Sequence, residues 1–205
     1  MRIKLLFASA ITIFTLAMIA APRAGAQDLP AQSLTRGTWE LGAFVGGGTG
    51  LGKSDSTQFA YAGGRGGLVL TGEHLSGLFR GNFEWAVDAM PIYMVMTTNG
   101  PVYSGSFKPV IWQWNFTRGK KIAPYMAAAG GIVFSRSNVP PGDTAPVNFT
   151  SQFVTGLRVF TKSGRAFFIE DAVGHLSNAS LGNHNPGYNG LIVFTVGYSW
   201  FKTRK

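Results

Sequence analysis

Apolar and polar side chains alternate along much of this chain, and the alternation is its strongest regular pattern. From Asn82 to Ala89 the odd positions are apolar and the even positions are mostly polar. From Val110 to Phe116 bulky residues alternate with Gln113 and Asn115, with Ile111 as the exception. A period of two places successive side chains on opposite faces of a β-strand. Beyond residue 26 no convincing helical periodicity is present, so the pattern predicts an all-β protein.

Eight stretches fit this strand pattern. They cover residues 38–46, 58–70, 81–96, 103–116, 122–134, 148–161, 165–177 and 190–201. Tilted strands of this length match the hydrocarbon thickness of a bilayer, and eight strands make the smallest outer-membrane barrels. The sequence therefore predicts an eight-stranded antiparallel transmembrane β-barrel in a bacterial outer membrane.

A soluble barrel of the lipocalin kind is the alternative architecture. An eight-stranded barrel has little interior volume, so small and polar residues are expected inside and Phe, Trp and Leu outside, on lipid. Bulky aromatics on one face and polar residues or glycine on the other favour the membrane protein, and the narrow lumen disfavours a pore. Candidates for an interfacial aromatic girdle are Trp112, Trp114, Tyr198 and Trp200.

Loop lengths predict which end of the barrel faces outward. With the N-terminus in the periplasm, the extracellular loops cover residues 47–57, 97–102, 135–147 and 178–189, and most of them are long. The returns at 117–121 and 161–164 are short, as periplasmic turns usually are, although the link at 71–79 is longer. This topology places the end of the 165–177 strand level with the outer leaflet.

The first 26 residues have the composition of a secretory signal. Arg2 and Lys4 precede an apolar run, and Ala24-Gly25-Ala26 forms a small-residue cleavage site. A retained membrane anchor is the alternative, but Pro22-Arg23 followed by small residues favours removal. We expect residues 27–205 to form a single β-barrel domain.

The net charge of the chain indicates the class of partner, and its cysteine content indicates whether disulfides can form. The full chain carries a formal net charge of +9, and removal of Arg2, Lys4 and Arg23 leaves +6. This excess suggests an anionic partner, and for an exported chain phosphate-bearing lipid is a better candidate than nucleic acid. Lys53 and Arg136 in the outer loops are candidates to meet lipid phosphates; the alternative is that the excess only keeps exposed ends soluble. The chain has no cysteine, so no disulfide stabilises the fold.

His175 and Ser177 place a potential base and a potential nucleophile two residues apart. On a strand both side chains share one face, with Cα atoms roughly 6.5 Å apart. A base beside a serine hydroxyl is what acyl transfer needs, because a free hydroxyl is a poor nucleophile at neutral pH. Alternation along the strand favours an outward-facing site. A hydrogen-bonded pair with no catalytic role is the alternative.

The stretch around this pair resembles a known family. Gly174-His175-Leu176-Ser177-Asn178-Ala179-Ser180-Leu181, then Asn183, Asn185-Pro186-Gly187 and Tyr198-Ser199-Trp200, is similar to the lipid A 3-O-deacylases, also called acyloxyacyl hydrolases. The resemblance implies an outer-membrane barrel esterase, without a cofactor, that removes the ester-linked acyl chain at position 3 of lipid A. It also implies lipopolysaccharide as the partner.

Roles for individual residues follow from the resemblance. Ser177 corresponds to the nucleophile and His175 to its general base. Asn178 and Asn185 fall where the family keeps asparagines, and their amides are candidate donors to the oxyanion. The alternative is that Asn178 to Tyr188 is only a loop, because Asn, Pro and Gly suit turns.

The third member of the catalytic triad departs from the family pattern. The family has an acidic residue about a dozen positions after the serine, where this chain has Asn189. An amide can hold the histidine tautomer but cannot balance the imidazolium charge, so weakened activity is expected. Strand parity also places Asn189 on the face opposite Ile192, unless a loop geometry breaks the alternation. Asp171 lies about 13 Å from His175 along an extended strand and is too far to replace it.

The remaining histidines, glycines and carboxylates have structural explanations. The three histidines are too scattered for a metal site, although His184 is either a loop residue or an alternative partner for Ser177. The glycines at 46–52 and 63–67 are not in a nucleotide-binding register and are assigned to barrel-rim loops and close strand packing. Glu73, Glu84 and Asp88 are interpreted as structural.

A second functional hypothesis remains open at this stage. A non-catalytic barrel that binds lipopolysaccharide or has a structural role would also explain the pattern, and Asn189 is the feature that supports it. The sequence leaves open whether the barrel acts alone or as a homodimer.

Overall fold

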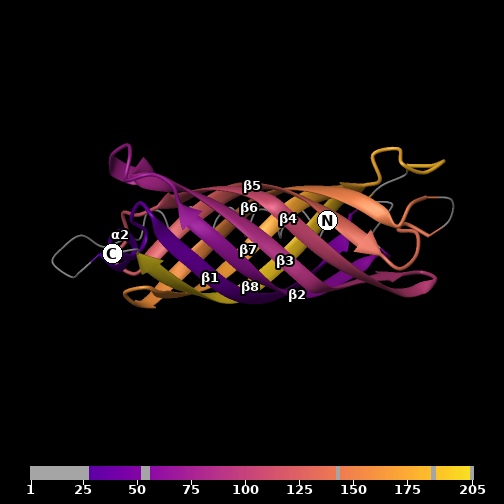
Figure 1. Cartoon of the computed structure of the whole chain (residues 1–205), viewed down its shortest axis with the longest axis horizontal. Coiled ribbons are helices and arrows are strands. Elements are labelled where there is room, and N and C mark those ends of the chain that lie inside the picture. The colour runs from indigo at the N-terminus through magenta and orange to yellow at the C-terminus, as the bar shows by residue number, and fades with distance from the viewer. Residues whose placement is uncertain (1–27, 52–55, 142–143, 186–187, 204–205) are drawn as a thin grey trace.

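The protein is a closed antiparallel β-barrel, seen in a computed structural model that describes residues 28–51, 56–141, 144–185 and 188–203 (Figure 1). The predicted signal peptide lies outside the described residues. The eight strands are β1 (Thr38–Gly50), β2 (Gln58–Val69), β3 (Gly81–Thr97), β4 (Gly100–Phe116), β5 (Ile122–Ser135), β6 (Val147–Lys162), β7 (Arg165–Ser177) and β8 (Tyr188–Thr203). Each strand pairs with its neighbours in sequence, and β8 pairs with β1. The predicted fold class is therefore confirmed.

Two short helices of the described residues lie at one end of the barrel, which we call the α2 end. They are α2 (Leu29–Ser33) and the 3-10 helix η2 (Gly77–Phe79). Leu34, next to α2, is completely buried in an apolar cluster with Val69 and Phe160 that closes the interior. None of the helices in the described residues is long and apolar enough to cross a membrane. We call the opposite end, where β7 ends and β8 begins, the loop end.

One glycine assignment made from the sequence is wrong. Gly46 to Gly50 belong to β1 rather than to a rim loop, and Gly52 lies outside the described residues. The expectation of close packing is confirmed, because a Cβ on Gly46 would lie 2.5 Å from the ring of Tyr61 and 2.6 Å from the Phe194 carbonyl oxygen. Glycine in β1 therefore makes room for a ring inside the barrel.

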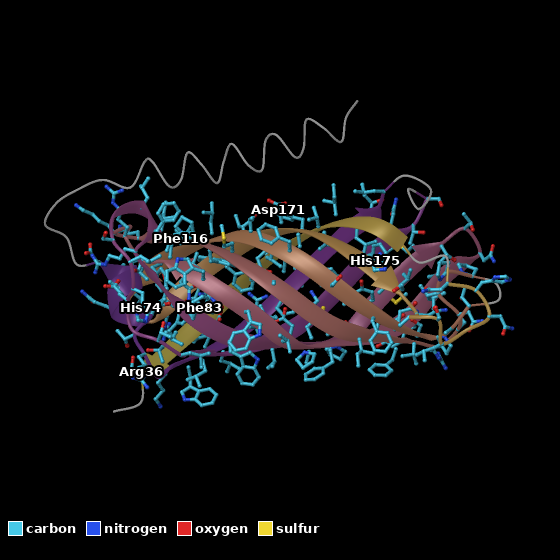
Figure 2. All side chains as sticks on the ribbon, turned by 90° about the horizontal axis from the view of Figure 1, so that it is seen from above. Arg36, His74, Phe83, Phe116, Asp171 and His175 are labelled. Atoms are coloured by element: carbon cyan, nitrogen blue, oxygen red, sulfur yellow. The ribbon has the colours of Figure 1, made fainter. Side chains whose placement is uncertain are left out.

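The outer wall is apolar. Trp39, Leu41 and Phe167 each expose more than half of their surface, and Figure 2 shows aromatic side chains projecting from the wall. A soluble barrel would have to hold these side chains in water, whereas a hydrocarbon environment solvates them. The burial pattern therefore favours the membrane barrel over the lipocalin-like alternative.

The interior near the α2 end holds a buried ion-pair network. Arg158 is 0% exposed and donates from Nη2 to Glu40 Oε2 at 2.6 Å and from Nη1 to Glu84 Oε2 at 2.8 Å. Asn115 Oδ1 accepts from the same guanidinium, and Ser199 Oγ donates to Glu40. The network joins β6 to β1 and β3 across the lumen.

A second network fills the middle of the barrel. Arg65 donates to Asp88 Oδ1 at 2.8 Å and to Glu170 Oε1 at 2.5 Å, and it is 4% exposed. Tyr125 donates to the same Glu170 oxygen at 2.8 Å. Beside it, Lys108 Nζ donates to Gln152 Oε1 at 2.6 Å. The structural interpretation of Glu84 and Asp88 is therefore confirmed.

Large apolar side chains fill the interior toward the loop end, which corrects the expectation that such residues lie only outside. Tyr61 and Tyr93 stack with ring centroids 5.7 Å apart, and Phe44 and Phe59 pack around them. The rings fit because glycines stand opposite some of them, as Gly46 does for Tyr61. Together with the two ion-pair networks, these rings occupy much of the barrel interior.

Removing the cation of the first network tests what holds the barrel together. Arg158→Ala leaves Glu40 and Glu84 buried without a counter-charge, and we expect it to lower the free energy of unfolding by about 3–5 kcal/mol. Urea unfolding in detergent or vesicles, followed by tryptophan fluorescence, measures the change. Arg136→Ala, at an exposed position of the loop end, is the control and should stay within about 0.5 kcal/mol of wild type. Equal midpoints for Arg158→Ala and wild type would contradict a structural role of the network.

Candidate active site

His175 and Ser177 lie on the outer face of β7, at its loop end. In the β6–β7 ladder His175 stands opposite Ser151, and Ser177 stands opposite Phe149, which is 39% exposed on the outer wall. Leu176, between them, is 0% exposed and points into the barrel. Figure 2 shows His175 close to the loop end. The strand thus places an imidazole and a hydroxyl side by side on the outer surface, as alternation predicted.

An apolar surface lies beside the pair, on the side of β6. Phe149 and Phe153 project outward there and are 39% and 50% exposed. Val173 stands opposite Phe153, and Ile132 of β5 stands opposite Phe149. A lipid tail lying along this wall would cover apolar side chains that water would otherwise meet.

The loop after Ser177 is organised around Asn178, which is 2% exposed. Its backbone N–H donates to Asn185 Oδ1 at 3.1 Å, and its Nδ2 donates to the His184 carbonyl oxygen at 2.9 Å. Its Oδ1 accepts from the backbone N–H of Ser180 at 2.9 Å. The structure therefore brings Asn178 and Asn185 together beside Ser177. His184 takes part in this network through its backbone carbonyl.

Asn189 belongs to β8, and the ladder places its backbone across from His175. Gly174 stands opposite Leu191 and Leu176 stands opposite Tyr188, so Asn189 and Gly190 together face the single residue His175. This is a β-bulge, and Gly190 has a φ of +121°, which glycine adopts readily. A bulge interrupts the alternation of faces, so the parity argument from Ile192 that opposed Asn189 does not hold.

The carboxylates near the pair differ in where they lie. Asp171 shares the outer face of β7 but stands opposite Thr155 and Phe194, nearer the middle of the barrel than His175 (Figure 2). Glu170 faces inward and is held by Arg65. Within the described ranges no group of three or more His, Asp or Glu side chains could hold a metal ion.

Comparison with known proteins decides the family. The family model described as lipid A 3-O-deacylase (PagL) matches residues 67–199, which is more than half of the chain. The chain belongs to this family. Lipid A 3-O-deacylases are outer-membrane β-barrel esterases, and membership implies lipid A deacylation in the outer membrane with lipid A as the substrate.

This lipid A 3-O-deacylase was also compared with solved structures of outer-membrane proteins. The N-terminal β-barrel domain of Pseudomonas aeruginosa OprF has a TM-score of 0.52 at 14% identity, covering 82% of this chain and 98% of that chain. The outer membrane enzyme PagL has a TM-score of 0.46 at 20% identity, covering 78% and 98%. At these identities the likeness to OprF shows the outer-membrane barrel fold alone. No curated protein sequence matches the chain significantly.

Sequence reasoning missed one residue beside the candidate site of this lipid A 3-O-deacylase. Ser151 on β6 is exposed and stands opposite His175, so a second serine lies near the imidazole. No local signal in the sequence identifies Ser151, because the pairing of β6 with β7 decides which residue lies opposite His175.

Of the two basic residues expected to meet phosphates, Arg136 lies at the loop end, and Lys53 lies outside the described residues.

The Asn178 network predicts a local effect on the loop. Asn178→Ala removes the side-chain bonds to His184 and Ser180, and each such bond contributes about 1 kcal/mol. We expect amide hydrogen exchange across residues 178–185 to accelerate on the order of tenfold, with the barrel strands unchanged. Leu181→Ala, which truncates a side chain that is 64% exposed, is the control. Unchanged exchange in Asn178→Ala would show that the network does not order the loop.

Proposed function

We propose that this chain is a serine esterase that hydrolyses the ester-linked acyl chain at position 3 of lipid A, with Ser177 as nucleophile and His175 as general base. One observation carries the proposal: the two side chains share the outer face of β7 at the loop end, beside an apolar wall. Lipid A would approach laterally, so neither the ester nor the acyl chain needs to enter the filled interior.

The chemistry proceeds by acyl transfer and hydrolysis. His175 takes the proton of Ser177 Oγ as this oxygen attacks the ester carbonyl carbon. The tetrahedral intermediate collapses when His175 returns the proton to the leaving sugar oxygen, which gives the acyl-serine and the free 3-hydroxyl of lipid A. His175 then deprotonates a water that attacks the acyl-serine, and it returns this proton to Ser177 Oγ as that oxygen leaves. The products are a fatty acid and regenerated Ser177.

Asn178 and Asn185 are proposed to stabilise the oxyanion of this intermediate. An asparagine amide carries two N–H donors, and Asn178 uses its Nδ2 on the His184 carbonyl, which leaves one donor for the substrate. Asn185 accepts from the Asn178 backbone through Oδ1, so its side chain is held beside the residue that follows Ser177. A donor of this kind contributes about 3 kcal/mol in comparable sites.

Asn189 is proposed as the third member of the triad, and this residue makes the enzyme weak. The β-bulge sets Asn189 and Gly190 opposite His175 in the ladder. An amide oxygen can accept a hydrogen bond from the imidazole and fix its tautomer, as in Cys-His-Asn enzymes. It carries no charge to stabilise the imidazolium that forms during attack, so turnover is slower than with a carboxylate.

Export and assembly complete the proposal. We propose that residues 1–26 are removed as a signal peptide and that residues 27–205 form the one barrel domain. The proposed pair, the oxyanion donors and Asn189 all come from a single chain. Homodimerisation stays a prediction, and the chemistry does not depend on it.

Substitution of the pair tests the mechanism. Ser177→Ala and His175→Ala should each lower the release of 3-hydroxy fatty acid from lipid A by about a thousandfold or more. Purified protein in detergent and mass spectrometry of the released acid give the measurement. Ser151→Ala is the matched control, because it removes a serine hydroxyl opposite His175 and should keep wild-type activity.

The outcomes of this experiment separate the alternatives. Loss in Ser151→Ala with activity kept in Ser177→Ala would move the nucleophile to β6. Full activity in both Ser177→Ala and His175→Ala would exclude the mechanism. A wild type without any hydrolysis would favour the non-catalytic barrel that binds lipopolysaccharide.

Restoring a charge at residue 189 tests the weakened triad. Asn189→Glu should raise kcat on the order of tenfold, because a carboxylate stabilises the imidazolium, and Asn189→Ala should lower it. Asp171→Asn is the control and should leave kcat unchanged, since Asp171 is about 13 Å from His175 along the strand. If Asn189→Glu and Asn189→Ala both behave as wild type, residue 189 has no part in catalysis.

A further inference from the structure

Basic side chains gather at the α2 end of the barrel. Within the described residues this end carries Arg36, Arg80, Arg118, Lys120, Lys121, Lys162, Arg165 and Lys202, against the acidic residues Asp28 and Glu73. Figure 2 shows Arg36 and His74 at this end, opposite His175. We call these eight basic residues the basic collar.

The rest of the described molecule does not share this charge. At the loop end, Arg136 is the one lysine or arginine in the part of the chain that the structure describes. Inside the barrel, Arg65 and Arg158 are each held by two carboxylates, and Lys108 donates to Gln152. Among the residues that the structure describes, the excess of positive charge is therefore located chiefly in the basic collar.

Tryptophans accompany two residues of the collar on the outer wall. Lys202 stands opposite Trp39 in the β1–β8 ladder, and Arg165 stands opposite Trp200 in the β7–β8 ladder. The tryptophans are 52% and 43% exposed. Tryptophan gathers at membrane interfaces, and Lys and Arg beside it extend their charged ends to lipid headgroups. This part of the wall therefore has the composition of a headgroup-level belt.

The segment before β3 adds an exposed apolar lip at the same end. Leu75, Leu78 and Phe79 are 70%, 42% and 63% exposed. The segment is held in place, because His74 bridges to Gly81 and Arg80 pairs with Glu73 at 2.5 Å. In Figure 1 this magenta segment reaches away from the barrel wall at the end where α2 lies. Apolar side chains held in this way favour insertion between lipids over exposure to water.

We propose that the α2 end binds anionic phospholipids of the leaflet that it faces. The basic collar takes the headgroup phosphates, Trp39 and Trp200 lie at the interface, and the apolar lip inserts among the upper acyl chains. Each basic residue near an anionic leaflet strengthens attraction, and the effect adds over a cluster. Short turns are typical of the periplasmic end of outer-membrane barrels, which makes the periplasmic leaflet the one that is bound.

Such binding would also fix the depth of the candidate site. Arg165 and Ser177 are the first and last residues of β7. Their separation along the strand is about 40 Å, and a tilt of about 40° reduces it to about 30 Å along the membrane normal. This is the hydrocarbon thickness of a bilayer. With Arg165 at one set of phosphates, Ser177 lies level with the opposite headgroups; this depth argument rests on the proposed function, whereas the lipid binding does not.

Lipid selectivity of the full chain tests the collar. Native mass spectrometry of the purified protein mixed with equal amounts of phosphatidylglycerol and phosphatidylcholine of the same acyl length should show preferential retention of phosphatidylglycerol. The variant Lys162→Gln/Arg165→Gln/Lys202→Gln should lose this preference by about tenfold or more. Arg136→Gln is the control, and heat-modifiable gel mobility verifies that each barrel is folded.

Either of two results overturns the proposal. Equal retention of the two lipids by wild type would show that the collar does not select anionic headgroups. A triple variant with the wild-type preference, or the same loss in Arg136→Gln, would place any selectivity elsewhere.

The apolar lip is tested by its depth in a membrane. Because the chain has no cysteine, Ser76→Cys and the control Ser137→Cys at the loop end can each carry one environment-sensitive fluorophore. In phosphatidylglycerol-containing vesicles, the label at 76 should shift to shorter wavelength and be quenched by lipids that bear a quencher high on the acyl chain. The label at 137 should not respond. A label at 76 that behaves like the one at 137 contradicts insertion, and neither measurement requires esterase activity.

Discussion

Charge pairing inside a closed, water-poor cylinder is the interaction on which the rest of the structure depends. A buried guanidinium is tolerated only when carboxylates and other acceptors surround it. Arg158 meets Glu40 and Glu84, and Arg65 meets Asp88 and Glu170. Three of these four contacts join strands that are not neighbours in the sheet, and the fourth, Arg65–Asp88, joins the neighbouring strands β2 and β3. Together they fix which residues of each strand face inward.

The placement of the candidate site follows from the inward orientation of these paired side chains. Glu170 is tied to Arg65 in the interior, so Asp171 and every second residue after it must face outward, up to His175 and Ser177. The two side chains proposed to react therefore lie on the membrane side of the wall. A lipid substrate can reach them by diffusing in the plane of the bilayer, and the filled interior needs to provide only rigidity.

The two ends of the barrel carry different surface features. The loop end carries the candidate site and the loop ordered by Asn178, with little charge in the residues described there. The α2 end carries the basic collar and the apolar lip. Because β7 runs from one end to the other, a contact that holds Arg165 at one leaflet also sets the depth of Ser177 at the other.

The sequence by itself determined the strands, their faces and the candidate pair, because alternation is local: each residue's face follows from its immediate neighbours. His175 and Ser177 were found in this way, and the family resemblance assigned their roles. Only the tertiary structure decided what depends on pairing between distant segments. Ser151 lies opposite His175 through the β6–β7 register, and a bulge at Gly190 cancels the parity argument against Asn189. The partners of Arg158 are likewise set by barrel closure, which joins positions far apart in the chain and leaves no local trace.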